Sequence, residues 1–157
     1  MRPITILDTT LRDGAQAEGV DFSLEDKIKI ARALERLGLT LLEGGNPAAN
    51  PKDRELFALQ RSAPFLTAAT LVPFGSTCRA GLEPARDAGL QTLLETGAPV
   101  VSVFGKADLL HVTDVLRVSP EENLRLIERS VRYLTDAGRT VYFDAEHFFD
   151  GCAHDAA

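Results

Sequence analysis

Short apolar runs alternate along the chain with longer segments in which polar and apolar residues recur at helical spacing. The apolar runs predict strands at 4–7, 39–45, 99–105 and 140–146 and a strand within 65–75, and residues 4–7 are predicted to be buried. Helical periodicity is clear at 23–38, 50–63 and 119–138. Strands that alternate with helices are typical of a parallel α/β protein.

The boundaries of the helices carry recognisable signals. Ser23 is a predicted N-cap with Asp26 as its capping-box partner, and Ser119 followed by Pro120 opens the last helix. Asn50 and Pro51 open helix 50–63, and Gly38 ends the first helix. The predicted buried faces are Leu24, Ile28, Ala31 and Leu34 in the first helix, and Leu124, Ile127, Val131 and Leu134 in the last.

The segment between the third and fourth strands gives a weaker signal. A helix is expected within 78–89 that starts late, because Pro84 would break one begun at Cys78. Residues 90–97 fit either a further helical piece or a strand. Residues 106–118 are expected to form a long connection after the fourth strand.

Polar residues close nearly every predicted strand. They are Asp8 to Asp13, then Glu43, Thr67 and Thr70, Ser102 and Lys106, and finally Asp144 and Glu146. This pattern favours a barrel, whose strands all converge on one site, over a doubly wound sheet. A complete barrel needs about eight strands and roughly 250 residues. We therefore expect residues 1–157 to be the N-terminal part, about five βα units, of a single (β/α)₈ TIM-barrel catalytic domain.

Composition narrows the classes of partner. The formal net charge of −6 does not favour nucleic acid or an anionic membrane as partners, and no apolar stretch approaches a membrane span. Cys78 and Cys152 are far apart, which indicates neither a disulfide framework nor a zinc site and suggests a reducing, cytoplasmic compartment. Glycine-rich phosphate loops and the serine-hydrolase motif are absent from the sequence.

The stretch DTTLRDGAQAEG, residues 8–19, contains the first candidate site. The Asp13 carboxylate can bind a divalent cation there. The adjacent Arg12 guanidinium can hold a carboxylate or stabilise a developing enolate oxygen. The alternative is a solvated turn with a local ion pair.

Three further acids fall at strand ends. Glu43 closes an apolar strand, where it either pairs with Arg12 on the neighbouring strand or faces water at the rim. Asp144 and Glu146 are two residues apart and share one face of their strand, where one can act as an acid or base.

The histidines give weaker signals. His111 lies in the long connection, where surface exposure competes with a catalytic role. A metal cluster of Glu146, His147, Asp150 and His154 fits no standard spacing, so a mixed polar loop is predicted there.

Five segments together resemble the N-terminal half of citramalate synthases. They are DTTLRDGAQAEG, FSLEDKIKIARALERLG, LLEGGNPAANPKD, HVTDVLRVSPEENLRLI and FDAEHFFDG. These enzymes belong with the isopropylmalate and homocitrate synthases. The resemblance implies a metal-dependent (β/α)₈ barrel that is a homodimer at full length. Its reaction condenses acetyl-CoA with a 2-oxo acid, here pyruvate, to give citramalate on a route to isoleucine.

The resemblance also implies roles for individual residues. Asp13 matches the ligand of a divalent metal of the Mg, Mn or Zn class, and Arg12 matches the arginine that stabilises oxygen charge. Glu43 matches the acid that pairs with this arginine, and Gln16 lies in the same active-site turn. In the last strand, Glu146 and Asp144 match positions that face the 2-oxo acid.

One departure from the family is large. Its other metal ligands come from an H-x-H motif, which is absent from this sequence. The C-terminal half of the barrel and the regulatory region are accordingly expected to be missing. Three readings compete with citramalate synthesis: condensation with another 2-oxo acid, the hydroxymethylglutaryl-CoA lyase reaction, and a catalytically inert truncated module.

Overall fold

A computed structural model describes residues 4–154 as a sheet with helices along it. The strands are β1 (Leu7–Asp8), β2 (Leu41–Gly45), β3 (Thr70–Ser76), β4 (Val100–Lys106) and β5 (Thr140–Glu146). The α-helices are α1 (Leu24–Arg36), α2 (Pro51–Ser62), α3 (Ala88–Glu95), α4 (Pro120–Asp136) and α5 (Phe148–His154). Gly14–Gln16 and Pro84–Arg86 form 3₁₀ turns, and His111–Leu116 forms a π-helical turn.

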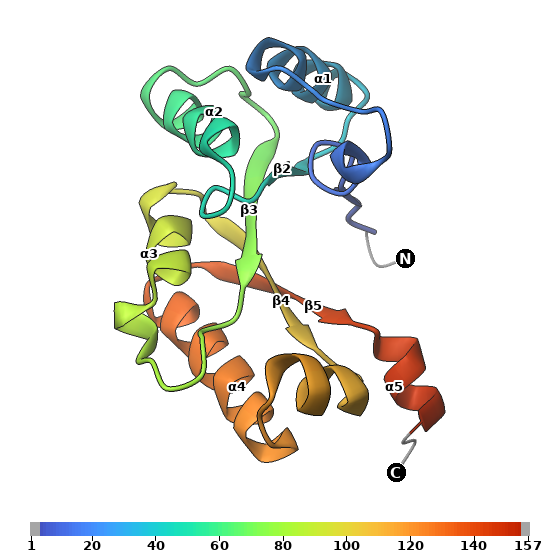
Figure 1. Cartoon of the computed structure of the whole chain (residues 1–157). Helices are drawn as coiled ribbons and strands as arrows, with labels where there is room; N and C mark the ends of the chain where they lie inside the picture. The colour runs from blue at the N-terminus through green and yellow to red at the C-terminus, as the bar shows by residue number, and fades with distance from the viewer. Residues whose placement is uncertain (1–3, 155–157) are drawn as a thin grey trace.

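The sheet has the strand order β1-β2-β3-β4-β5, and every neighbouring pair is parallel. Sequential order without a reversal is the order of a barrel and not of a doubly wound sheet, which confirms the predicted architecture. Strand β3 changes partner along its length: it pairs with β2 over Thr70–Pro73 and with β4 over Phe74–Ser76. Figure 1 shows α1 and α2 beside the first strands, α4 along the last two, and α5 apart at the end of β5.

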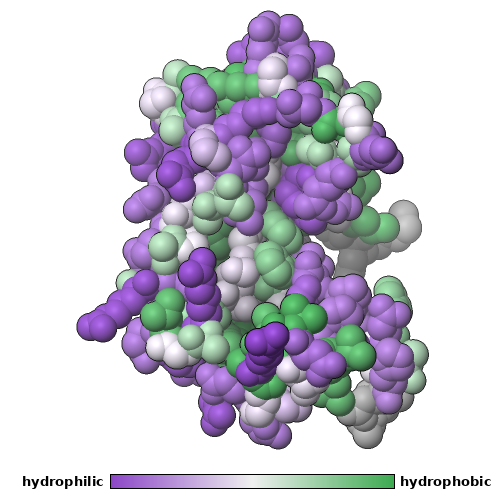
Figure 2. All heavy atoms as spheres, viewed as in Figure 1, coloured by the Kyte–Doolittle hydropathy of each residue, from purple (hydrophilic) through white to green (hydrophobic). Residues whose placement is uncertain are grey.

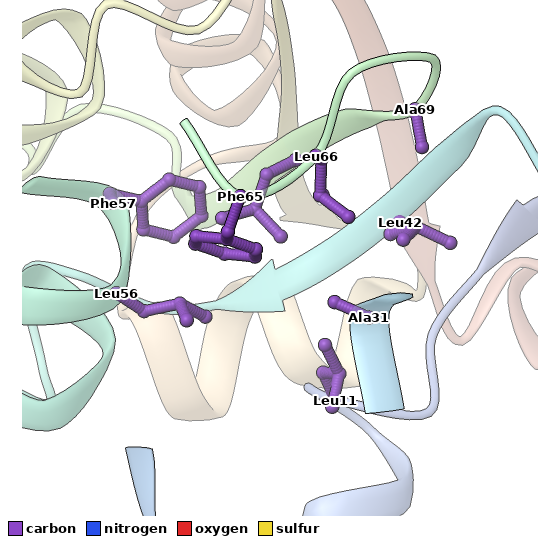
Figure 3. Packing of buried hydrophobic residues seen from close by; sticks show 9 residues of the cluster. Leu11, Ala31, Leu42, Leu56, Phe57, Phe65, Leu66 and Ala69 are labelled. Carbon is purple, nitrogen blue, oxygen red and sulfur yellow. The ribbon is translucent and has the colours of Figure 1, made fainter. Parts of the chain in front are cut away.

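Two separate apolar clusters fill the space between sheet and helices. The first joins Leu42 and Leu71 of the sheet to Ala31, Leu56 and Phe57 of α1 and α2, as Figure 3 shows for most of its members. The second cluster includes Cys78, Leu90, Leu93, Val101, Val103 and Leu134. Since these strand residues point toward the helices, their neighbours along each strand point to the opposite, inner face of the sheet.

The predicted starts of α1, α2 and α4 are confirmed, but one predicted buried face is not. Ser23 and Asp26 form the capping box of α1, and Asn50 and Ser119 cap α2 and α4. In α4 the buried residues are Asn123, Leu126, Ser130 and Leu134, whereas Leu124 is 65% exposed. The prediction that Leu124 faces the core is therefore wrong, because Asn123 and Ser130 are buried through hydrogen bonds to backbone groups.

Three element boundaries also differ from prediction. The strand expected at 4–7 is only Leu7–Asp8, and Ile4 and Ile6 are exposed because β1 pairs on one side only among the described strands. The helix expected within 78–89 begins at Ala88, where the Asp87 side chain accepts hydrogen bonds from the first turn. Residues 90–97 are thereby mainly helical. The polar loop predicted after β5 contains the helix α5.

The surface is mixed in character. On the face shown in Figure 2, hydrophilic residues cover most of the surface, and hydrophobic residues show between them in the upper, middle and lower parts. Within residues 4–154, every helix is too short or too polar to cross a membrane.

Candidate functional site

The inner face of the sheet carries the predicted site residues at its carboxyl end. In the parallel ladder Glu43 pairs with Val72, Phe104 with Asp144, and Lys106 with Glu146. Paired residues share a face of the sheet. Glu43, Asp144 and Glu146 therefore lie on one face, opposite to the side chains that pack on the helices.

Arg12 is held from two directions. Its Nε donates a hydrogen bond to Oε2 of Glu43 over 2.7 Å, and its guanidinium carbon lies 3.9 Å from the ring centroid of Phe74. The Glu43 side chain is 2% exposed and that of Arg12 is 17% exposed. The predicted Arg12–Glu43 pair is thus confirmed, and the alternative of a Glu43 carboxylate facing water at the rim is excluded.

The turn after β1 presents the other residues of the DTTLRDGAQAEG stretch. The carbonyl of Thr9 accepts hydrogen bonds from three successive backbone N–H groups, those of Arg12, Asp13 and Gly14. The Asp13 carboxylate also accepts from Nη1 of Arg12 over 3.1 Å and remains largely exposed. The local ion pair considered for this turn is therefore present in addition to the buried one. Gln16 ends the following 3₁₀ turn.

A cleft of about 290 Å³ opens beside this turn. Arg12, Gln16 and Phe74 line one part of it, and Lys27 and Asp53 line another. The cleft combines cationic, amide and aromatic groups, which suits a small anionic or polar ligand. The structure therefore brings Arg12, Asp13, Gln16 and Glu43 to one corner.

The acids of β5 belong to a second corner of the same face. Glu146 forms an ion pair with Lys106 of β4, a partner that the sequence reasoning did not assign. The Lys106 ammonium lies 5.9 Å from the centroid of the Phe104 ring. Phe104 in turn stacks on Phe74, with 5.1 Å between ring centroids. Two stacked rings thus lie between the Arg12–Glu43 pair and the Lys106–Glu146 pair, and Asp144 stands half-buried next to Glu146 on the same face.

Behind the first corner lies a buried ion pair that sequence reasoning missed. The Lys27 ammonium contacts the Asp53 carboxylate and donates to the carbonyls of Leu11 over 2.9 Å and Gly44 over 3.0 Å. Lys27 is 4% exposed and Asp53 is 5% exposed. The available signal was the position of Lys27 on the apolar stripe of α1, three residues after Leu24 and four before Ala31.

The three histidines lie near the ends of β4 and β5. The buried Asp108 carboxylate contacts Nδ1 of His154 and Nδ1 of His111, each over 2.9 Å. The hydrogen bonds from His154 and then His111 lower the pKa of Asp108, and the hydrogen bond to Asp108 raises the pKa of His154. His111 stacks on His147 with 3.8 Å between ring centroids, so His111 is an ordered part of this cluster and not a free surface residue.

The residues present do not form a complete metal site. Within residues 4–154, His, Cys, Asp and Glu side chains nowhere gather in a group of three or more that could hold a metal ion. Asp13 is one exposed carboxylate that is already bonded to Arg12. A divalent metal in a protein usually takes more than one protein ligand, so residues 4–154 do not by themselves fit a metal centre.

Known proteins resemble the chain over nearly its whole length. The HMGL-like family model matches residues 3–157. The (R)-citramalate synthase of Aquifex aeolicus is 49% identical over 94% of this chain, and that of Streptomyces coelicolor is 46% identical over 93%. A 2-isopropylmalate synthase of Shouchella clausii is 32% identical over 93% of the chain. The chain spans 28%, 27% and 27% of the length of these three relatives, respectively.

Solved structures agree on the fold. The HMG-CoA lyase of Bacillus subtilis superposes with a TM-score of 0.66 and 25% sequence identity, covering 89% of this chain and 45% of that one. The five parallel strands are thus half of a barrel. With the family model matched from residue 3 to residue 157, the chain belongs to the HMGL-like family.

Proposed function

We propose that this chain supplies the enolate-binding corner of an enzyme that condenses acetyl-CoA with pyruvate to give citramalate and CoA. The observation that carries the proposal is Arg12, which Glu43 and Phe74 fix at the carboxyl end of the sheet. The curated (R)-citramalate synthases, at 45–49% identity, support this substrate over those of the more distant 2-isopropylmalate synthases.

The proposed carbon–carbon bond formation creates negative charge on oxygen twice, on the enolate and on the former keto oxygen. The methyl group of acetyl-CoA loses a proton, its enolate carbon bonds to the keto carbon of pyruvate, and the keto oxygen becomes a hydroxyl group. Water then cleaves the thioester and releases CoA. A guanidinium already oriented toward such an oxygen stabilises the charge without reorganising during the reaction. Arg12 fits this role because Glu43 binds its Nε and Asp13 binds its Nη1, while Nη2 has no partner among the described hydrogen bonds and can meet a ligand.

The remaining roles follow from position on the inner face. We assign Gln16, which lines the cleft with Arg12, and Asp144 to substrate binding. Glu146 is the proposed acid or base, and Lys106 orients its carboxylate. Among residues 4–154, we assign Asp13 as the one metal ligand. We also propose that the full-length enzyme is a homodimer and that it acts in isoleucine biosynthesis.

The test measures CoA release from acetyl-CoA with pyruvate, 2-oxoisovalerate or 2-oxoglutarate as acceptor, with Mg²⁺, Mn²⁺ or Zn²⁺. It uses this chain and the same chain followed by the C-terminal part of the Aquifex aeolicus enzyme. Because Cys152 is exposed, CoA is quantified by chromatography and not by a thiol reagent alone.

We expect the fused protein to prefer pyruvate and to lose activity in the Arg12→Ala and Asp13→Ala variants. Preference for another 2-oxo acid would assign the chain to that branch of the family. A folded fusion that is inactive with every acceptor would refute the proposal and favour an inert module.

A further inference from the structure

The backbone beside Arg12 and the backbone beside Glu43 are held by the same buried side chain, that of Lys27. Leu11 directly precedes Arg12, and Gly44 directly follows Glu43. The carbonyls of Leu11 and Gly44 both accept hydrogen bonds from the Lys27 ammonium. One cation on α1 thus connects the backbone of the turn after β1 to the backbone at the end of β2.

The Lys27 ammonium has all of its donors engaged. A lysine ammonium carries three hydrogens, and Lys27 uses them on Leu11, Gly44 and the Asp53 carboxylate. The other oxygen of Asp53 accepts a hydrogen bond from the backbone N–H of Asn46 over 2.9 Å. The pair therefore connects four segments: α1, α2, the β1 turn and the end of β2.

The backbone of β2 is shaped for this pair. Gly45 has a φ of +133°, and a Cβ atom there would lie 2.2 Å from an Asp53 carboxylate oxygen. Only glycine leaves room for the carboxylate at this distance and adopts this φ without strain. The sequence thus leaves space beside β2 for a buried acid that has no direct contact with Arg12 or Glu43 among the described hydrogen bonds.

A buried ion pair such as Lys27–Asp53 contributes little net stability, because removing two charges from water costs free energy. Apolar residues of similar volume often stabilise a protein as well or better, whereas an ion pair with fixed hydrogen bonds specifies one arrangement. We propose that Lys27 and Asp53 are positioning residues, which hold Arg12 at the distance from Glu43 that the condensation requires. The inference deepens the proposed function, since it concerns how the enolate-binding arginine of that site is held.

The test removes both charges together. Lys27→Met with Asp53→Asn leaves no unpaired buried charge and keeps an acceptor for the N–H of Asn46, so the variant is designed to fold. Lys29→Met is the matched control, because it makes the same change on α1 at a side chain that is 67% exposed. Cooperative thermal unfolding, followed by circular dichroism, verifies the fold of each variant.

The first readout is independent of catalysis and uses this chain. Phenylglyoxal modifies accessible arginines, and peptide mass mapping gives the rate at Arg12. We expect this rate to rise at least about threefold in the double variant and to stay at the wild-type value in Lys29→Met, because a guanidinium released from its ion pair is more accessible. The half-buried Arg139 at the far end of β5 serves as an internal reference. An unchanged rate at Arg12 would overturn the inference.

If the Arg139 rate rises as well, the double variant has lost its fold. Lys27→Gln with Asp53→Asn then replaces it, because this pair of changes also leaves no unpaired buried charge and the two amides can share a hydrogen bond. With the Arg139 rate at its wild-type value, a selective rise at Arg12 in this variant supports the inference, and an unchanged Arg12 rate overturns it.

The second readout is the condensation in the fused protein described above. Misplacing a catalytic group by about 1 Å can cost about 100-fold in rate, so kcat should fall by that order while KM for acetyl-CoA changes little. A rise of KM for acetyl-CoA by about 100-fold with an unchanged kcat would contradict the positioning role of Lys27 and Asp53. If the wild-type fusion shows no condensation, the proposed function fails, and the Arg12 modification rates still decide the positioning inference.

Discussion

Replacing Glu43 measures how firmly the buried ion pair holds the site. Removing one partner of a buried ion pair costs about 3–5 kcal/mol, because the other charge is left without compensation. Arg12 keeps 17% of its side-chain surface and a second contact, with Asp13, so the low end of this range applies. For Glu43→Ala we expect a loss of about 3 kcal/mol in the free energy of unfolding.

Glu43→Gln should cost less, since the amide oxygen can still accept from Nε of Arg12. The Arg12 guanidinium stays charged, so this bond still contributes about 1.5–3 kcal/mol; set against the loss of about 3 kcal/mol in Glu43→Ala, it leaves a cost of about 1 kcal/mol. With a urea dependence of about 2 kcal/mol per M, Glu43→Ala should lower the unfolding midpoint by about 1.5 M and Glu43→Gln by about 0.5 M.

The assay is urea unfolding at neutral pH, followed by circular dichroism. Glu128→Ala is the matched control, because it breaks an exposed pair with Arg132 and should cost no more than about 0.5 kcal/mol. A midpoint for Glu43→Ala equal to that of the control would refute the reasoning that the Arg12–Glu43 pair is energetically coupled to the fold.

Three further predictions concern protonation and packing. Hydrogen bonds from backbone N–H groups before β3 lower the pKa of Glu35 below 4.5. The stability that Glu35 contributes is therefore complete above pH 4.5 and is lost on acidification. As the pH is lowered, the urea midpoint should fall less steeply for Glu35→Gln than for the wild type. The hydrogen bond to Asp108 raises the pKa of His154 above 6.5, so the stability that His154 contributes is complete below pH 6.5 and is lost as the pH rises through the pKa of the folded state. Amide hydrogen exchange in α5 should therefore accelerate with pH more than the intrinsic exchange rate does. His154→Ala should abolish this additional acceleration. Leu134→Ala should destabilise by about 2–5 kcal/mol and Leu124→Ala by less than about 0.5 kcal/mol in thermal unfolding, and equal losses would contradict the observed face of α4.

The sequence was sufficient to predict the first corner of the site. Arg12 and Glu43 follow consecutive apolar runs, and the carboxyl ends of consecutive parallel strands lie side by side. A buried carboxylate also requires a partner, which left Arg12 as the natural choice. Local spacing and a general rule about burial were therefore enough for this contact.

The rest depended on information that is not local. The position of Lys27 on the apolar stripe of α1 indicates burial, but its three acceptors come from three other segments, and no spacing within α1 encodes them. In α4, Asn123 donates a hydrogen bond to the carbonyl of Lys106 and Ser130 accepts one from the N–H of Cys78, and these bonds turn the buried face away from Leu124. The helix after β5 was missed because its packing relies on Gly151, whose Cβ would lie 2.4 Å from the carbonyl oxygen of Ala107.

The two apolar clusters have a consequence for combined substitutions. They share no residue, and β3 connects them by pairing with β2 through one part of its length and with β4 through the other. Residues without common neighbours contribute to stability additively, within about 0.5 kcal/mol. The effects of changes at Leu42 and at Leu134 should therefore sum, and each half of the interior can vary in sequence without compensating changes in the other.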